Sequence, residues 1–159
     1  EAFYGNQYSD DVYARHIQTS DGAFVLGGNH YPQDNLGQAI LRKFDQNGTL
    51  LWENLYGNTG WNENDWFYSI IETQDGNLVA TGVTNYGNTF GDVFVVKTDA
   101  NGNEIASTSF GSTRQYTTEH GKGISELDNG DFLVVSHYDS ISYEHNRVIK
   151  FDENLNARC

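Results

Sequence analysis

Three aspartates at the start of equivalent polar turns are the residues of this chain best suited to bind a metal ion. Asp45, Asp99 and Asp152 begin the segments Asp-Gln-Asn-Gly, Asp-Ala-Asn-Gly and Asp-Glu-Asn-Leu. Ca²⁺ prefers carboxylate and carbonyl oxygens gathered in one loop. The acidic residue that would complete an EF-hand loop is missing, and Asp or Asn side chains that bond their own turn backbone explain the same pattern. The sequence therefore predicts no required cofactor and leaves weak calcium binding as the alternative.

Aromatic residues in the predicted loops form a second group that could bind a ligand. The candidates stand beside Asn, Asp and Gly, and they are Tyr31, Trp61, Trp66, Tyr86 and Tyr138. Carbohydrate sites combine such rings, which stack on the C–H faces of sugars, with amides and acids that bind the hydroxyl groups. Glycans are therefore one candidate ligand class, and packing of the rings between repeats is the alternative.

Motifs of common catalytic sites do not occur in the sequence. There is no Gly-x-Ser-x-Gly elbow, phosphate loop or dinucleotide fingerprint. The five histidines lack the His-x-x-x-His spacing of a zinc site. His120, His137 and His145 are placed in connecting loops of the last third, which leaves a histidine cluster there as a hypothesis. We expect a protein that is not an enzyme.

The net charge excludes one large class of partners. The chain has 22 acidic and nine basic residues, for a formal net charge of -13, so a nucleic-acid backbone would be repelled. No apolar run is long enough to insert into a membrane. The absence of a signal peptide and initiator Met predicts a mature or excised segment. Cys159 is the one cysteine, so the chain has no internal disulfide.

The elements that must position these residues are three copies of one unit, which recur at a shift of about 54 residues. The equivalent positions are Gly5, Gly57 and Gly111; Asp21-Gly22, Asp75-Gly76 and Asn129-Gly130; and Lys43-Phe44-Asp45, Lys97-Thr98-Asp99 and Lys150-Phe151-Asp152. The chain is expected to form one repeat domain with units of about 1–52, 53–106 and 107–159.

Each unit reads as four antiparallel strands. Two β-rich runs surround the Asx-Gly turn, as in a hairpin. A third run, such as Val93 to Lys97, ends in the polar turn described above, and a fourth starts near Leu50 in the first unit. Four antiparallel strands per repeat predict an all-β fold of three propeller blades, with a parallel β-helix as the nearest rival. Gly28 and Gly82 are expected to permit close packing or a β-bulge.

The repeat resembles a tandem repeat of secreted and surface proteins of bacteria and archaea, Trp-x-x-x-Tyr-Gly, Ser-Ile-x-x-Thr-x-Asp-Gly and Gly-Asp-x-x-x-x-Lys-x-Asp-x-x-Gly. The second unit matches best, through Trp52, Tyr56-Gly57, Ser69-Ile70, Thr73, Asp75-Gly76, Gly82, Thr84, Gly91-Asp92, Lys97, Asp99 and Gly102-Asn103. The resemblance implies a β-propeller at an extracellular or cell-surface location. The third unit departs from the pattern, with Leu155 and Ser136 at glycine positions, which predicts a reshaped loop.

Three blades are fewer than the roughly four to eight that usually close a ring. The sequence therefore predicts a partial propeller, or half of a six-bladed ring, whose partners are other copies of itself or further blades of a longer chain. Phe3, Tyr4 and Cys159 are the expected residues of the two joining ends. The predicted function is a non-enzymatic extracellular module for binding or self-assembly. A lectin-like glycan binder is the first alternative, and a fragment of a propeller enzyme is the second.

Overall fold

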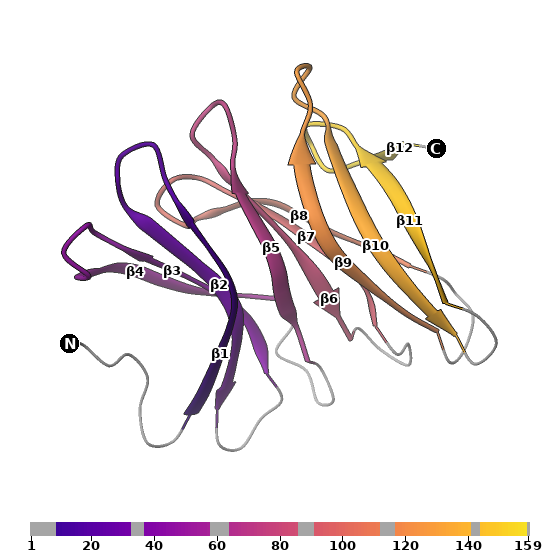
Figure 1. The fold of residues 1–159 in the computed structure, drawn as a ribbon, viewed down its shortest axis with the longest axis horizontal. Coiled ribbons are helices and arrows are strands. Elements are labelled where there is room, and N and C mark those ends of the chain that lie inside the picture. Colours follow the sequence, from indigo (N-terminus) through magenta and orange to yellow (C-terminus); the bar gives the residue numbers. More distant parts are fainter. Residues whose placement is uncertain are drawn as a thin grey trace.

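The computed structural model describes residues 9–32, 37–57, 64–85, 91–111, 117–140 and 144–158. Within these ranges the chain forms twelve strands and no helix (Figure 1). The described residues accordingly include no helix long and apolar enough to cross a membrane. The strands form three four-stranded antiparallel sheets, each made from consecutive strands. The predicted fold class, three antiparallel propeller blades, is confirmed.

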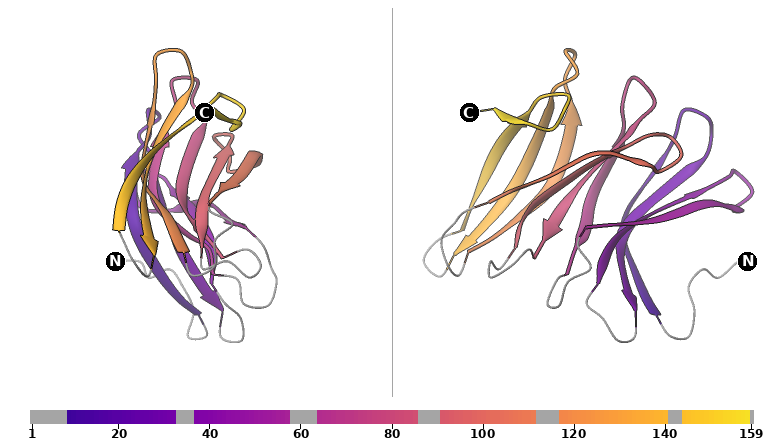
Figure 2. Two further views of the ribbon diagram at one scale, coloured as in Figure 1. Left: turned by 90° about the vertical axis from the view of Figure 1, so that its right-hand side faces the viewer. Right: turned by 180° about the vertical axis from the view of Figure 1, so that it is seen from behind.

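The three sheets are numbered as blades 1 to 3 in chain order. Blade 1 contains β1 (Ser9–Gln18), β2 (Phe24–Pro32), β3 (Gln38–Phe44) and β4 (Leu50–Tyr56). Blade 2 contains β5 (Trp66–Glu72), β6 (Leu78–Thr84), β7 (Asp92–Thr98) and β8 (Glu104–Phe110). Blade 3 contains β9 (Thr117–Glu126), β10 (Phe132–Ser140), β11 (Glu144–Phe151) and β12 (Ala157–Arg158). The blades fan out side by side, with the first and third at opposite ends (Figures 1 and 2).

The Asx-Gly pairs form the tight turns that the sequence predicts between the first two strands of each blade. In blade 1 the Gly22 amide donates to the Thr19 carbonyl at 2.8 Å, and the Thr19 amide donates to the Ala23 carbonyl at 2.8 Å. Gly22, Gly76 and Gly130 have φ angles of +83°, +80° and +81°. Glycine enters this left-handed region at little steric cost, which is why the hairpins can be recognised from sequence.

One turn keeps the same geometry without glycine. Gly48 and Leu155 occupy equivalent places in the turns between the third and fourth strands of blades 1 and 3. The Leu155 amide donates to the Asp152 carbonyl at 2.9 Å, just as the Gly48 amide donates to the Asp45 carbonyl at 3.0 Å. The φ angle of Leu155, +63°, costs about 1–2 kcal/mol for a leucine. Its side chain is only 2% exposed and packs between blades 2 and 3, so burial offsets the strain and this turn is not reshaped.

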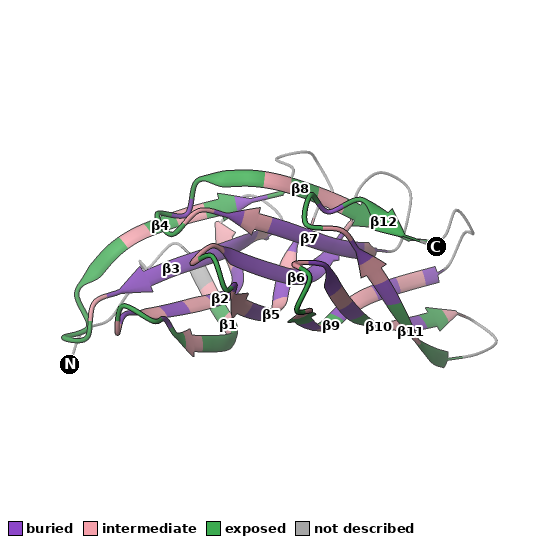
Figure 3. Cartoon of the chain, turned by 90° about the horizontal axis from the view of Figure 1, so that it is seen from above, coloured by how far each residue is buried: buried purple, intermediate pink, exposed green. Residues whose placement is uncertain are grey.

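The hydrophobic core lies between the blades. One cluster joins blades 1 and 2, and its buried members are Val25, Ala39, Leu41, Tyr56, Phe67, Ile70, Leu78, Ala80, Phe94 and Val96. A second cluster joins blades 2 and 3 through Val79, Val93, Val95, Ile124, Phe132, Val134, Ile149, Phe151 and Leu155. Because blade 2 is covered on both faces, all of β6 is buried, as its continuous apolar run predicts. The outer strands β4 and β8 are largely exposed (Figure 3).

The strands β1, β5 and β9 lie side by side along one side of the fan, opposite β4, β8 and β12 (Figure 3), and are called the inner strands. Each contains a β-bulge at the same place, so that one residue per strand is extra to the pairing: Ala14, Tyr68 and Lys122. The bulged backbone approaches a glycine on the next strand. A Cβ atom on Gly82 would lie 1.6 Å from the Trp66 carbonyl oxygen, and one on Gly28 would lie 2.0 Å from that of Val12. The bulge interpretation of these two glycines is therefore confirmed.

Blade 3 achieves the same bulge with the glycine on the other strand. Gly28 pairs with Tyr13 in blade 1, whereas Ser136 pairs with Gly121 in blade 3. A Cβ atom on Gly121 would lie 2.1 Å from the Thr81 hydroxyl oxygen of blade 2. In blade 3 the glycine of the pair is therefore Gly121 on the inner strand, and Ser136 stands at the position that is glycine in the other two blades.

Candidate functional site

A row of aromatic and basic side chains lies along the inner strands. Trp66 and the bulge residue Tyr68 lie on β5, and His120 and the bulge residue Lys122 hold the equivalent positions on β9. Tyr31 reaches the row from the end of β2. These five residues are called the inner-strand surface, and they span all three blades.

Ring contacts connect the inner-strand surface from blade 1 to blade 3. The ring centroids of Tyr31 and Trp66 are 5.8 Å apart in an edge-to-face arrangement, and those of Trp66 and Tyr68 are 6.1 Å apart and nearly parallel. Tyr68 meets the His120 ring edge-to-face at 5.7 Å. The Lys122 ammonium lies 3.9 Å from the Tyr68 ring centroid, within the range of a cation–π interaction. All the aromatic members are half-buried, so each presents part of its ring to solvent.

Asn64 fixes the blade 1 end of this surface. Its side-chain amide donates to the Tyr31 hydroxyl at 3.2 Å, and its carbonyl oxygen accepts from the Trp66 indole N–H at 3.1 Å. The Asn29 amide donates to the same carbonyl oxygen at 3.2 Å. Asn64 and Asn29 therefore hold the two rings in one arrangement, which lowers the entropy cost of binding a ligand against them.

The imidazole of His120 is neutral at physiological pH. Burial is the main cause that lowers its pKa to about 4, and the nearby Lys122 and His137 lower it further. Its buried Nδ1 atom has no hydrogen-bond partner among the described residues. Burial also lowers the pKa of Lys122 and raises that of Tyr68. The surface thus carries a lysine beside an uncharged aromatic row.

The structure brings together two of the five aromatic residues predicted to bind a ligand. Tyr31 and Trp66 are in contact, as described above. Tyr138 lies apart in blade 3, where it is buried, stacks on His145 at 4.5 Å and lies beneath Arg147 at 5.8 Å. The other two, Trp61 and Tyr86, lie outside the described residues.

Sequence reasoning missed Tyr68 and Lys122 as members of the site. Tyr68 stands two positions after Trp66 in a strand whose side chains alternate, and the bulge makes it extra to the pairing. Gly82 carried the signal, because a glycine opposite Tyr68 and its neighbours marks the bulge. Lys122 holds the place of Tyr68 in blade 3, where it is likewise extra to the pairing.

The three aspartates predicted as metal ligands cap their own turns. Oδ1 of Asp45 accepts the amides of Asn47 and Thr49, both at 2.8 Å. Backbone hydrogen bonds of this kind are the main cause that lowers the pKa of Asp45 and of Asp152. For Asp99, the main cause of the lowered pKa is the hydrogen bond from the side-chain amide of Asn103. This arrangement is the turn-capping alternative considered above.

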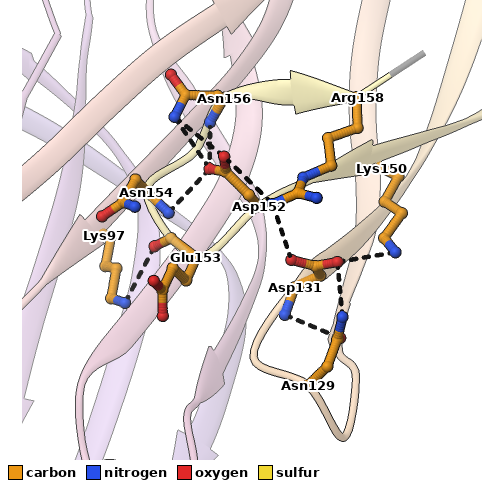
Figure 4. A network of polar contacts seen from close by, with 9 residues as sticks. All are labelled: Lys97, Asn129, Asp131, Lys150, Asp152, Glu153, Asn154, Asn156 and Arg158. Carbon is orange, nitrogen blue, oxygen red and sulfur yellow. Dashed lines mark hydrogen bonds and ion pairs between the residues drawn. The ribbon is translucent and has the colours of Figure 1, made fainter.

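The aspartate of blade 3 also lies close to a cation. Oδ1 of Asp152 accepts the amides of Asn154 and Asn156 at 3.0 and 2.9 Å, and the Arg158 guanidinium lies 3.6 Å from Oδ2 (Figure 4). Arg158 also approaches Asp131, which pairs with Lys150 at 2.8 Å. In the described part of the chain, no group of three or more His, Cys, Asp or Glu side chains is placed to hold a metal ion.

The placement of three histidines in loops was wrong. His120 lies on β9 directly across from His137 on β10, and His145 lies on β11 across from Tyr138. The strands are longer than the sequence predicts, because alternation continues beyond the apolar runs. Phe3, Tyr4 and Cys159, the expected joining ends, lie outside the described residues.

Residues of the recurrent motif stabilise the scaffold. The Trp52 indole N–H donates to the Ala100 carbonyl at 3.2 Å, and the Tyr56 hydroxyl donates to the Gly102 carbonyl at 2.7 Å, both from blade 1 to blade 2. Thr73 and Asp75 bond each other inside their turn. The repeat is therefore a signature of fold rather than of a particular chemistry.

Comparison with known proteins gives a likeness of fold. No protein-family model and no curated protein matches the chain. A solved structure of a protein of unknown function from Bacteroides caccae is similar, with a TM-score of 0.58 and 12% sequence identity over 94% of this chain and 45% of that chain. At this identity the likeness shows a shared fold alone, and the chain spans under half the length of the protein it matches.

Proposed function

We propose that this chain is a non-enzymatic β-propeller module that binds its ligand at the inner-strand surface. The observation that carries the proposal is the continuous row of Tyr31, Trp66, Tyr68 and His120 with Lys122 at its end. These residues come from three blades, and the blade cores do not require half-exposed rings at an edge. Partly exposed aromatic rings held in place by hydrogen bonds are typical of ligand sites.

An extracellular or cell-surface location is part of the proposal. It is supported by the resemblance of the repeat to those of secreted and surface proteins of bacteria and archaea, of which we propose this chain to be a member. The motif residues Trp52, Tyr56 and Asp75 make scaffold contacts, so this resemblance concerns the scaffold and leaves the ligand to the inner-strand surface.

Carbohydrate is the ligand class that the surface favours. Tyr31 and Trp66 offer ring faces for the C–H groups of a sugar, and Asn64 lies between them. The Lys122 ammonium adds a charged group at the far end. A short, neutral or mildly acidic oligosaccharide lying across β5 fits this pattern.

A glycan array followed by calorimetry with the best ligand tests the proposal. Trp66→Ala and Tyr68→Ala should each weaken binding by about tenfold or more, the usual cost of removing a central aromatic contact. His145→Ala is the matched control, because it removes an exposed ring of blade 3 outside the surface. Equal losses in the control, or an array without binding, would contradict glycan binding. Cleavage of the bound glycan would contradict a non-enzymatic role.

A further inference from the structure

The outer faces of blades 1 and 3 repeat the faces that pack inside the molecule. In blade 1, Val25 and Leu41 point toward blade 2, so alternation directs the half-buried Phe24 and Leu26 away from it. Ile40, on the same side of β3, is already fully buried within the chain. This face of blade 1 is called the first end face. In blade 3, Val134 and Ile149 point toward blade 2, and the opposite face is called the last end face. It carries Leu133, Val135, Val148 and Lys150.

Positions on these two faces correspond to the two sides of the interior interfaces. Phe24 and Leu26 hold the places that Leu78 and Ala80 take in blade 2 and that Phe132 and Val134 take in blade 3, all of them core residues that face the preceding blade. Leu133 holds the place of Val25 and Val79, which face the following blade. The first and last end faces are therefore the two halves of one type of interface.

The first end face carries a hollow, and the last end face carries exposed apolar side chains. A hollow of about 350 Å³ lies on the first end face, lined by Tyr13, Ala14, Arg15, His16, Phe24 and Leu26. On the last end face Val135 is 45% exposed, and its cross-strand partner Val148 is 67% exposed. Inside the molecule, the place of Val135 is taken by Gly27, which lies against Phe67, the residue equivalent to Tyr13. Val135 of one chain would thus meet Tyr13 of another at the hollow.

A polar contact recurs at both interior interfaces, and the residues equivalent to its two partners lie unpaired with each other on the two end faces. The Ser20 amide and hydroxyl donate to the Glu72 carboxylate at 2.7 and 3.0 Å. One blade later the Gln74 amide donates to the Glu126 carboxylate at 2.8 Å. Asp128 holds the place of Ser20 and Gln74 in blade 3, on the last end face.

The residue that would complete this third contact is Gln18, which holds the place of Glu72 and Glu126 at the end of its inner strand. A glutamate there would repel Asp128. A glutamine there could instead accept from the Asp128 backbone amide through its side-chain carbonyl oxygen and donate to the Asp128 carboxylate through its side-chain amide. The substitution at Gln18 therefore matches the acidic residue at Asp128.

We propose that the last end face of one chain packs on the first end face of a second copy, in the register of the interior interfaces. Two chains joined this way at both ends would close a ring of six blades, within the range of about four to eight found in propellers. The proposal is independent of the ligand proposed for the inner-strand surface, because none of the residues named for this contact belongs to that surface.

Sedimentation equilibrium over a range of concentrations tests the proposed contact. The chain should form a dimer, and Val148→Asp should shift it to monomer, with at least about a tenfold increase in the dissociation constant. Ile105→Asp is the matched control, because Ile105 is a 54% exposed apolar residue on the outer strand of blade 2. A chain that stays monomeric, or a control that dissociates equally, overturns the proposal.

A charge cycle at the third contact tests the register. Gln18→Glu should weaken dimerisation about three- to fivefold at low salt, as expected for one exposed charge contact. Asp128→Ser alone should have little effect. The double variant recreates the Ser20–Glu72 pair and should restore the affinity of the unmodified chain. Additive or absent effects of the two substitutions overturn this register, and circular dichroism shows that each variant is folded.

Discussion

Gly82→Ala should destabilise the protein far more than its size suggests. The added Cβ atom would lie 1.6 Å from the Trp66 carbonyl oxygen and 2.8 Å from the Phe67 Cα atom. Both are backbone atoms of the bulge, so no side-chain rotation can relieve the clash. The bulge must shift, and overpacking of this kind costs up to about 3 kcal/mol. For a domain of this size, about 3 kcal/mol corresponds to a melting temperature lower by roughly 6–12 °C.

Gly123→Ala is the control for this substitution. Gly123 also lies beside a bulge on an inner strand, but nothing lies within 4 Å of an added Cβ atom there. Its alanine variant should stay within about 0.5 kcal/mol of the unmodified protein. Both variants are compared by urea unfolding and by thermal melting at one fixed protein concentration, because self-association would make the melting temperature depend on concentration. Equal stabilities for the two variants would refute the reasoning from the bulge.

Three further predictions concern charge. The pKa of His120 is about 4 in the folded state, below the ordinary value of 6.5, so the unfolded state binds more protons between these two pH values. The free energy of unfolding should therefore fall as the pH drops from 6.5 to 4. A His120→Phe variant whose unfolding has the same pH profile would contradict this. Arg42→Ala removes the 2.8 Å guanidinium partner of the buried Asp11 carboxylate, which keeps its contact with His30, and should cost about 3 kcal/mol in urea unfolding. Lys43→Met keeps the packing of the buried lysine stem and breaks only the pair with Asp21, which is 57% exposed, and should cost about 1 kcal/mol or less; similar costs would show that burial of the pair does not decide the effect. A chelator should leave the melting temperature unchanged, because the turn aspartates bond their own backbone amides; a marked drop would reveal a structural metal ion.

The fold could be predicted from sequence because its local signals agree with its packing. Gly22 and Gly76 mark turns that need a positive φ angle, and the continuous apolar run of β6 marks a strand covered on both faces. These are properties of short segments. Leu155 shows the limit of such reasoning, because a turn that usually needs glycine keeps its shape when the side chain is buried between two blades.

The candidate site could be predicted only in part, because it depends on contacts between blades. Trp66 and Tyr31 were recognisable as aromatic residues beside Asn and Asp, but their predicted placement in loops, like that of Tyr138, was wrong, because all three lie on strands. Their contact through Asn64, and the continuation of the row through Tyr68 to His120, follow from the side-by-side arrangement of inner strands that are about 54 residues apart in sequence. No periodicity within one strand encodes that arrangement.

Disulfide trapping between two chains tests the central claim, that the outer faces of blades 1 and 3 are halves of one interface. The place of a Cβ atom at Gly27 lies 3.6 Å from the Cβ atom of Phe67, within the range of a disulfide, and Val135 and Tyr13 hold the equivalent positions. In chains that also carry Cys159→Ser, Val135→Cys in one chain and Tyr13→Cys in the other are mixed under mild oxidation and separated by non-reducing electrophoresis. We predict a mixed disulfide dimer that forms far faster than with Ile105→Cys in place of Val135→Cys. Equal, slow cross-linking of both pairs would contradict the claim.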